Sequence, residues 1–191
     1  MPFTPSKIEG IRSDCGPLVS KITEGVSMLE KYLQAEASMH SVGARFILAA
    51  GRKYDNRLLQ HRFGRGMLQA CYRNACDLAL AHPGELTYCE GRALSCGIIP
   101  IEHAWCVTPD GEVVDTTWSE DECSYFGVCF DTEWLHGWVE SRPRYGVMAE
   151  LFPLELLHLD PATYLAMPDP AQLEATRRLQ ADVLAMLKQP G

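Results

Sequence analysis

A turn sequence near the middle of the chain places the strongest constraint on the fold. The segment 109–111, Pro-Asp-Gly, lies between two short runs of strand-forming residues at 101–107 and 112–118. Proline and aspartate suit the first positions of a tight turn, and glycine tolerates positive φ, so the segment predicts an antiparallel hairpin. A further strand-like run at 86–94 precedes the hairpin. We therefore expect this central part of the chain to form an antiparallel sheet.

Helical patterns occupy the chain on both sides of this sheet. Five segments have the spacing or the composition of helices: 22–33, 41–50, 69–81, 132–140 and 170–188. Residues 125–130 predict a further short strand, and the basic stretch 52–65 predicts a connection with a solvated surface. We therefore expect one α+β domain over 1–191, with N-terminal helices and C-terminal helices packed on one antiparallel sheet.

The charge and hydropathy of the chain narrow its partners and its location. The formal net charge is −8 at pH 7, so the field around the protein repels the phosphates of nucleic acid. No apolar stretch approaches the length that spans a membrane, and the first ten residues are mixed and polar, unlike a secretory signal. We therefore expect a cytoplasmic protein without a nucleic-acid or membrane partner.

Eight cysteines are a high count for 191 residues. Zinc sites usually contain Cys-x-x-Cys or His-x-x-x-His pairs, whereas the nearest cysteine spacings here are 71 to 76, 123 to 129 and 89 to 96. With 47% hydrophobic residues, the chain can build a core without disulfides. We therefore expect most cysteines to be small, free core residues, and we expect neither a metal nor another cofactor.

Cys71 has the surroundings that cysteine chemistry requires. It falls in the first turn of the helix predicted over 69–81, where the partial positive charge of the helix start lowers the pKa of a thiol. Such chemistry also needs a base within reach and a group that orients the base. His103 and Asp115 lie on the two strands of the predicted hairpin, opposite or diagonal to each other. The three residues therefore form a candidate catalytic triad.

Four short motifs connect these residues to a known superfamily. They are Cys71-Tyr-Arg-Asn-Ala, Tyr88-Cys-Glu-Gly, His103-Ala-Trp and Asp115-Thr-Thr-Trp. In this order they resemble the core of the transglutaminase-like (papain-like) cysteine hydrolases, in which a cysteine at a helix start precedes an HAW strand and a D-x-T-W strand. The stretch 71–130 is similar to uncharacterised bacterial and phage proteins and covers about a third of the chain.

The resemblance implies a thiol hydrolase, or an acyl or amide transferase, that acts on a protein, a peptide or a small amide. In this family's mechanism Cys71 would attack the carbonyl carbon, His103 would carry the proton, and Asp115 would orient the imidazolium. The product of the attack is a thioester on the enzyme. Hydrolysis and transfer differ only in whether water or an amine resolves that thioester.

Four further residues are candidates for contact with a substrate. Gln69 is the side chain nearest to the nucleophile that could donate a hydrogen bond to an oxyanion. Glu90 is a polar residue on a core strand, where it either lines a pocket or pairs with Arg92. Trp105 and Trp118 are either core residues or a platform for the substrate.

Other interpretations stay open for the function and for the nucleophile. The chain can be a catalytically silent binding module that keeps the same scaffold. It can also be a small-molecule N-acyltransferase resembling the arylamine N-acetyltransferases, in which a cysteine follows an Arg-Gly pair such as Arg65-Gly66. Cys89 competes with Cys71 as the nucleophile, but it falls inside a predicted strand, where no helix start would lower the pKa of its thiol.

Overall fold

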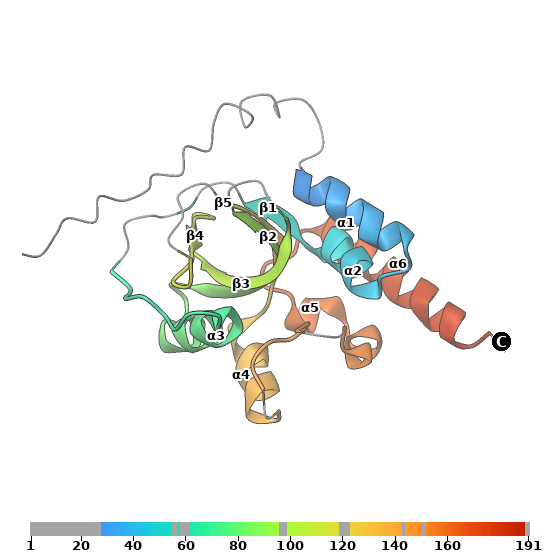
Figure 1. Cartoon of the computed structure of the whole chain (residues 1–191). Helices are drawn as coiled ribbons and strands as arrows, with labels where there is room; N and C mark the ends of the chain where they lie inside the picture. Colours follow the sequence, from blue (N-terminus) through green and yellow to red (C-terminus); the bar gives the residue numbers. More distant parts are fainter. Residues whose placement is uncertain are drawn as a thin grey trace, which may run out of the picture.

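The computed structural model (Figure 1) describes residues 28–54, 57, 62–95, 99–118, 123–142, 144–149 and 152–189. In this part of the chain the protein has an α+β fold, with helices before and after one antiparallel sheet, as the sequence predicts. The helix expected over 22–33 is observed from Met28, and its expected first turn lies outside the described residues.

One curled sheet forms the centre of the molecule. Its strands are β1 (Arg52–Tyr54), β2 (Thr87–Ser95), β3 (Ile101–Val107), β4 (Val113–Val114) and β5 (Cys123–Cys129). Their order is β1-β5-β2-β3-β4, and every neighbouring pair runs antiparallel. An isolated parallel bridge between Arg57 and Val113 joins the segment after β1 to β4. The two edges of the sheet therefore approach each other, and the sheet curls as Figure 1 shows.

The predicted hairpin forms, but its second strand is shorter than expected. The turn closes with a φ of +83° at Gly111. The second strand ends at Val114 and does not continue to residue 118. The reason is Asp115, whose Oδ1 accepts backbone N–H groups from residues 117 and 118. This local hydrogen bonding competes with the ladder and bends the chain away from β3.

Of the two further strands, β1 is not predicted by the sequence and β5 is. β1 lies in the basic stretch for which the sequence predicts a connection. Two of its three residues are exposed and only Tyr54 is buried, so its sequence resembles that of a surface loop. β5, expected as a short strand over 125–130, is observed over 123–129 and lies between β1 and β2. Its Gly127 faces Gly91 of β2, and a Cβ on either glycine would lie only 2.3 Å or 2.2 Å from a carbonyl oxygen of the neighbouring strand. Glycine therefore permits the close approach of these two strands.

Helices cover one face of the sheet. They are α1 (Met28–Ser38), α2 (Val42–Ala50), α3 (Cys71–Ala81), α4 (Thr132–Glu140), α5 (Pro161–Tyr164), α6 (Pro170–Leu187) and the 3-10 helix η2 (Leu154–His158). Ser41, Asp131 and Asp169 each accept a backbone N–H in the first turn of the helix that follows, which fixes where α2, α4 and α6 begin. The larger apolar core lies between these helices and the sheet. No described helix is both long and apolar enough to cross a membrane.

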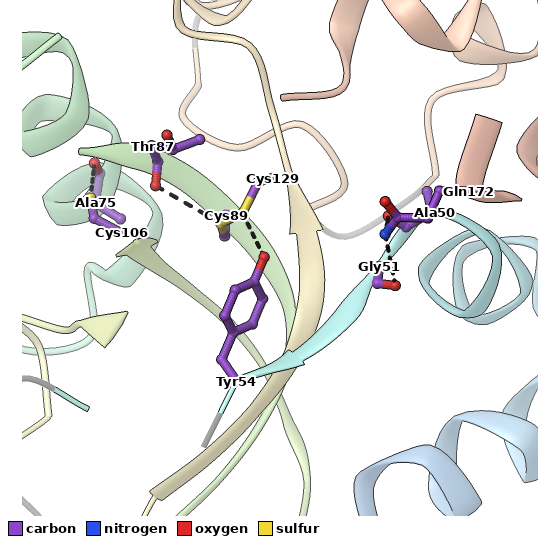
Figure 2. The surroundings of a disulfide bond; sticks show 9 residues. All are labelled: Ala50, Gly51, Tyr54, Ala75, Thr87, Cys89, Cys106, Cys129 and Gln172. Carbon is purple, nitrogen blue, oxygen red and sulfur yellow. Dashed lines mark hydrogen bonds between the residues drawn. A yellow bond between two sulfur atoms is a disulfide. The ribbon is translucent and has the colours of Figure 1, made fainter. Parts of the chain in front are cut away.

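The other face of the sheet carries a smaller core and a disulfide bond. Cys89 and Cys129 are direct partners in the ladder between β2 and β5, and they are joined as a disulfide (Figure 2). The hydroxyl of Tyr54 lies 2.9 Å from Cys129 Sγ and donates to it, because a disulfide sulfur has no proton. These two cysteines are therefore exceptions to the expectation that most cysteines are small, free core residues. In this form Cys89 has no thiol with which to replace Cys71 as the nucleophile.

The remaining described cysteines carry thiols. Cys76 and Cys106 are buried in the larger core, as expected for small core residues. Cys106 Sγ donates to the carbonyl of Ala75 at 3.1 Å, a contact that is drawn in Figure 2. Cys71 and Cys123 are partly exposed. These two are therefore the described thiols that a reagent in solution can reach most easily.

Candidate active site

Cys71 is the first residue of α3. The backbone turns just before it, where the exposed Gln69 adopts a left-handed φ of +59°. The N-cap residue is Ala70, whose methyl group cannot accept a hydrogen bond from the helix start. The sulfur of Cys71 is instead an acceptor there, with the backbone N–H of Tyr72 directed toward it. The helix start therefore acts on the thiol, because its free N–H groups favour an anion.

His103 connects the thiol of Cys71 to the carboxylate of Asp115. His103 lies on β3 and is 1% exposed, and Asp115 follows β4 directly and is 2% exposed. His103 Nε2 lies 2.8 Å from Asp115 Oδ2. The same imidazole forms a hydrogen bond with the Cys71 thiol, for which Nδ1 is the ring nitrogen that remains. The structure thus brings these three residues together around one imidazole ring.

The pKa values of the three groups shift so that a negative Cys71, a positive His103 and a negative Asp115 are favoured. Burial raises the pKa of the Cys71 thiol, but His103 and the backbone N–H of Ala104 lower it more, so that it lies below its ordinary value. Burial lowers the pKa of His103, but hydrogen bonds to Asp115 and Cys71 raise it to about 9. Burial also raises the pKa of Asp115, which His103 and two backbone N–H groups bring below its usual value. These shifts favour the thiolate of Cys71 and the imidazolium of His103 over the neutral thiol and imidazole.

The short length of β4 explains how the thiol reaches the histidine. β4 pairs with β3 only at Cys106 and Val107, so no described strand pairs with Ala104 on that side. The backbone N–H of Ala104 lowers the pKa of the Cys71 thiol, so the sulfur lies close to this part of β3. A β4 that continued to residue 118 would compete for the same backbone groups. The early end of β4 therefore leaves space for the start of α3.

Asp115 is held from several directions. Its Oδ1 accepts the backbone N–H of Thr117 at 2.8 Å and of Trp118 at 3.2 Å. Its Oδ2 also accepts the hydroxyl of Tyr125 at 3.0 Å. Arg57 Nη2 donates to the backbone carbonyls of Asp115 at 3.2 Å and of Trp118 at 2.6 Å. These donors keep the buried carboxylate ionised and in place, and Arg57 is not the solvated residue that its basic stretch predicts.

The two candidate tryptophans have different environments. Trp118 is partly exposed and stacks on His103, with ring centroids 4.1 Å apart and an interplanar angle of 16°. Trp105 is 1% exposed and packs in the smaller core, 5.0 Å from the ring of Tyr125. Trp118 therefore covers one face of the imidazole and can also meet a substrate, whereas Trp105 is enclosed by core residues.

Glu90 projects from the opposite face of the sheet to His103, because side chains alternate along a strand and Glu90 pairs with the residue after His103. Its carboxylate accepts the hydroxyl of Tyr88 at 2.7 Å and the backbone N–H groups of residues 147–148. Burial raises its pKa. Arg92 forms ion pairs with two other glutamates, at 3.0 Å and 2.9 Å. Glu90 therefore anchors the segment 147–148. These hydrogen bonds satisfy its carboxylate without a contact to Arg92.

A cavity of about 330 Å³ lies between α2, α3 and the strands β2 and β3. Glu90 contributes to its lining, together with Tyr72 and Glu102. Tyr72 follows Cys71 in the sequence and Glu102 precedes His103, but the side chains of the Cys71 group do not line the cavity. The cavity therefore lies on the opposite face of the sheet from His103. It shares with the site only residues that are neighbours in sequence.

The sequence gives little indication of three residues that hold the site, namely Arg57, Asn74 and Tyr125. Arg57 lies in a polar stretch, where a partly buried arginine produces no local pattern. Tyr125 reaches Asp115 across the sheet, and its contact depends on a register that the sequence does not specify. Asn74 follows Cys71 by three positions, which places the two side chains on one side of a helix and is a usable signal.

The described residues contain no group of three or more His, Cys, Asp or Glu side chains that could hold a metal ion. No model of a known protein family matches this sequence, and searches of curated proteins and of solved structures found no match either. The resemblance to transglutaminase-like proteins is therefore carried by the four sequence motifs alone.

Proposed function

We propose that the protein is a thiol hydrolase or acyl transferase of the transglutaminase-like kind, with Cys71 as nucleophile, His103 as base and acid, and Asp115 as the orienting acid. One observation carries the proposal: the imidazole of His103 is hydrogen-bonded to a thiol on one side and to a buried carboxylate on the other. A nucleophile, a base and a group that fixes the tautomer of the base require this arrangement.

In the proposed first step, the Cys71 thiolate attacks the carbonyl carbon of an amide. The C–N bond then breaks, and the imidazolium of His103 gives its proton to the leaving amine. An acyl group remains on Cys71 as a thioester, and His103 is neutral. In the second step His103 removes a proton from water or from an acceptor amine, which attacks the thioester carbon and releases the Cys71 thiolate. The product is a carboxylic acid in hydrolysis and a new amide in transfer.

The start of α3 supports the electrostatic part of the proposal. Negative charge on the attacked oxygen develops next to Cys71, beside N–H groups that belong to the first turn of the helix. Backbone donors at such a position stabilise an oxyanion because they are already oriented before the reaction. This arrangement can supply the oxyanion donors without a contribution from the exposed side chain of Gln69.

The proposed substrate is an amide in a protein, a peptide or a small molecule, and the proposed location is the cytoplasm. The surface just before Cys71 supports contact with a partly apolar substrate, because Met67 is 51% exposed and Leu68 is 84% exposed. Trp118 adds a partly exposed ring next to His103. A peptide with apolar side chains fits these surroundings better than a highly charged small molecule.

Acylation by p-nitrophenyl acetate tests the proposal. We expect a burst of p-nitrophenolate and an acetyl group on Cys71, located by peptide mass spectrometry. Cys71→Ser should lose the burst. Cys123→Ser is the matched control and should keep it, because Cys123 is the other partly exposed thiol of the described chain and burial raises the pKa of its thiol.

Equal acetylation of Cys71 and Cys123, or a folded protein that is acetylated at neither, would contradict the proposal. In the second case the chain is better described as a binding module. If Cys71 is acetylated, glycine methyl ester as a competing amine distinguishes the two activities. Formation of N-acetylglycine methyl ester indicates transfer, and release of acetate alone indicates hydrolysis.

A further inference from the structure

Asn74 lies one turn after Cys71 on α3, and its side-chain amide makes three hydrogen bonds. Its Oδ1 accepts the backbone N–H of Met67 at 3.0 Å. Its Nδ2 donates to the carbonyl of Met67 at 2.7 Å and to the hydroxyl of Thr117 at 2.9 Å. The backbone of Met67 fixes the orientation of the amide, since a carbonyl can only accept and an N–H can only donate.

These bonds join three segments that meet at the site. Asn74 belongs to the helix of Cys71, Met67 belongs to the segment that leads into this helix, and Thr117 follows Asp115. The backbone N–H of Thr117 donates to Asp115 Oδ1 while its hydroxyl accepts from Asn74. Thr117 therefore links the carboxylate of Asp115 directly to α3, the helix that carries the thiol of Cys71.

The surroundings leave the amide of Asn74 little freedom to move. A Cβ added to Gly66 would lie 2.4 Å from Asn74 Cγ, so the backbone of Gly66 is packed directly against the side chain. The N–H of Gly66 donates to the carbonyl of Thr116 at 2.9 Å, which joins the segment before α3 directly to the segment after Asp115. The position of Asn74 is therefore determined by packing as well as by hydrogen bonds.

We propose that Asn74 is a positioning residue, which sets the placement of Cys71 relative to His103 and Asp115 through its bond to Thr117. The inference rests on the proposed function of Cys71. The thiol and the carboxylate come from separate segments, and each contacts His103 through one hydrogen bond. Such bonds weaken steeply with distance, so an independent shift of α3 would reduce the preference for the thiolate.

The test compares the variants Asn74→Ala and Thr117→Val by site-resolved alkylation with iodoacetamide as a function of pH. Both variants lose the bond between the two segments, and Thr117→Val leaves the bonds of Asn74 to Met67 intact. We expect each to shift the pH profile of Cys71 alkylation upward by about one unit, so that alkylation slows by up to about tenfold on the acidic side of the profile. Thr117→Ser keeps the hydroxyl and should restore the reactivity that Thr117→Val loses.

Arg73→Ala is the matched control on the same helix. Arg73 is exposed and pairs with Asp77, away from the bonds of Asn74. This variant should leave the pH profile of Cys71 unchanged, and alkylation of Cys123 provides an internal reference in every sample. Loss of thermal stability in Asn74→Ala with an unchanged Cys71 profile would assign Asn74 a structural role only and would overturn the inference.

The result for the unmodified protein separates the inference from the proposed function. If Cys71 of the unmodified protein is alkylated no faster than Cys123 at pH 6, the proposed function fails first, and the inference about Asn74 fails with it. If Cys71 is selectively reactive and both Asn74→Ala and Thr117→Val retain that reactivity, the inference alone fails.

Discussion

The imidazole of His103 takes its properties from two neighbours of opposite function, a carboxylate and a thiol. Hydrogen bonds to Asp115 and Cys71 raise its pKa to about 9 against the effect of burial. Removal of either neighbour should therefore lower the pKa of His103, and removal of a thiol that does not contact the ring should leave this pKa unchanged. The ring protons of His103 report this directly, because their NMR shifts follow protonation.

We expect an NMR titration of the unmodified protein to show His103 protonated through neutral pH, with a midpoint at about 9. In Cys71→Ala the midpoint should fall toward lower pH, because the hydrogen bond and the negative charge of the thiolate are lost. Cys123→Ala is the control and should leave the midpoint unchanged. A midpoint that stays the same in Cys71→Ala would show that the thiol does not interact with this ring.

Asp115→Asn tests the orienting carboxylate. We expect turnover of p-nitrophenyl acetate to fall by a factor on the order of 10³ to 10⁴, because an amide favours the wrong tautomer of His103. The free energy of unfolding should also fall, by about 1–3 kcal/mol, since the carboxylate accepts four hydrogen bonds in a buried position. Tyr125→Phe is the control, because it removes one donor and keeps the carboxylate. Lower stability with undiminished turnover in Asp115→Asn would make this residue structural.

At the scale of elements, the segment before α3 packs against the first turn of that helix. Gly66 packs against Asn74, whereas Gly64 has nothing within 4 Å of the position that a Cβ would take. Gly66→Ala should displace Asn74 and raise the pKa of the Cys71 thiol by about one unit, as loss of the Asn74 side chain would. Gly64→Ala should leave it unchanged. The pH dependence of Cys71 alkylation measures both, and equal profiles would show that the packing of Gly66 is irrelevant to the thiol.

Elements that depend on near neighbours can be predicted from the sequence, and those that depend on distant partners cannot. The starts of α2 and α4 follow from Ser41 and Asp131, which cap a helix within three positions. β1 is missed because its partners lie on β5, far along the chain. β4 is overestimated because Asp115 bonds the backbone of the next residues, a competition that the alternating pattern does not reveal.

The same distinction applies to the candidate site. Cys71, His103 and Asp115 can be proposed from their residue types and their motifs, and the hairpin predicts the contact between the last two. Arg57 and Tyr125 contact Asp115 only after the sheet has curled, so no local pattern identifies them. The pairing of Cys89 with Cys129 depends on the register between β2 and β5. No local sequence pattern predicts that register.

For the whole molecule, the disulfide is a covalent link between two central strands, and it spans a sequence separation of 40 residues. Such a link restricts the unfolded chain more than the folded one. We expect a reductant to lower the free energy of unfolding in urea by about 2–4 kcal/mol. The double variant Cys89→Ala with Cys129→Ala should show no response to reductant. An equal response in both proteins would contradict a contribution of this bond to stability.

The same bond tests the proposed location of the protein. Disulfides persist mainly in oxidising compartments and are rare in the cytoplasm. If the protein is cytoplasmic, acid quenching of cells followed by alkylation under denaturing conditions and mass spectrometry should find Cys89 and Cys129 alkylated and therefore reduced. A disulfide recovered intact under the same conditions would contradict the cytoplasmic proposal.

The hairpin that carries His103 and Asp115 has a consequence for the order in which the protein folds. The two residues are 12 positions apart, so the loop between them closes at a smaller entropic cost than the longer one that brings Cys71 to the same ring. We expect the hairpin to form first and α3 to dock later, an order that pulse alkylation during refolding can time. A newly synthesised chain would then carry a thiol with the reactivity of free cysteine until its tertiary structure is complete. The proposed nucleophile would thus become reactive only in chains that have folded correctly, which would limit unwanted acylation by incomplete ones.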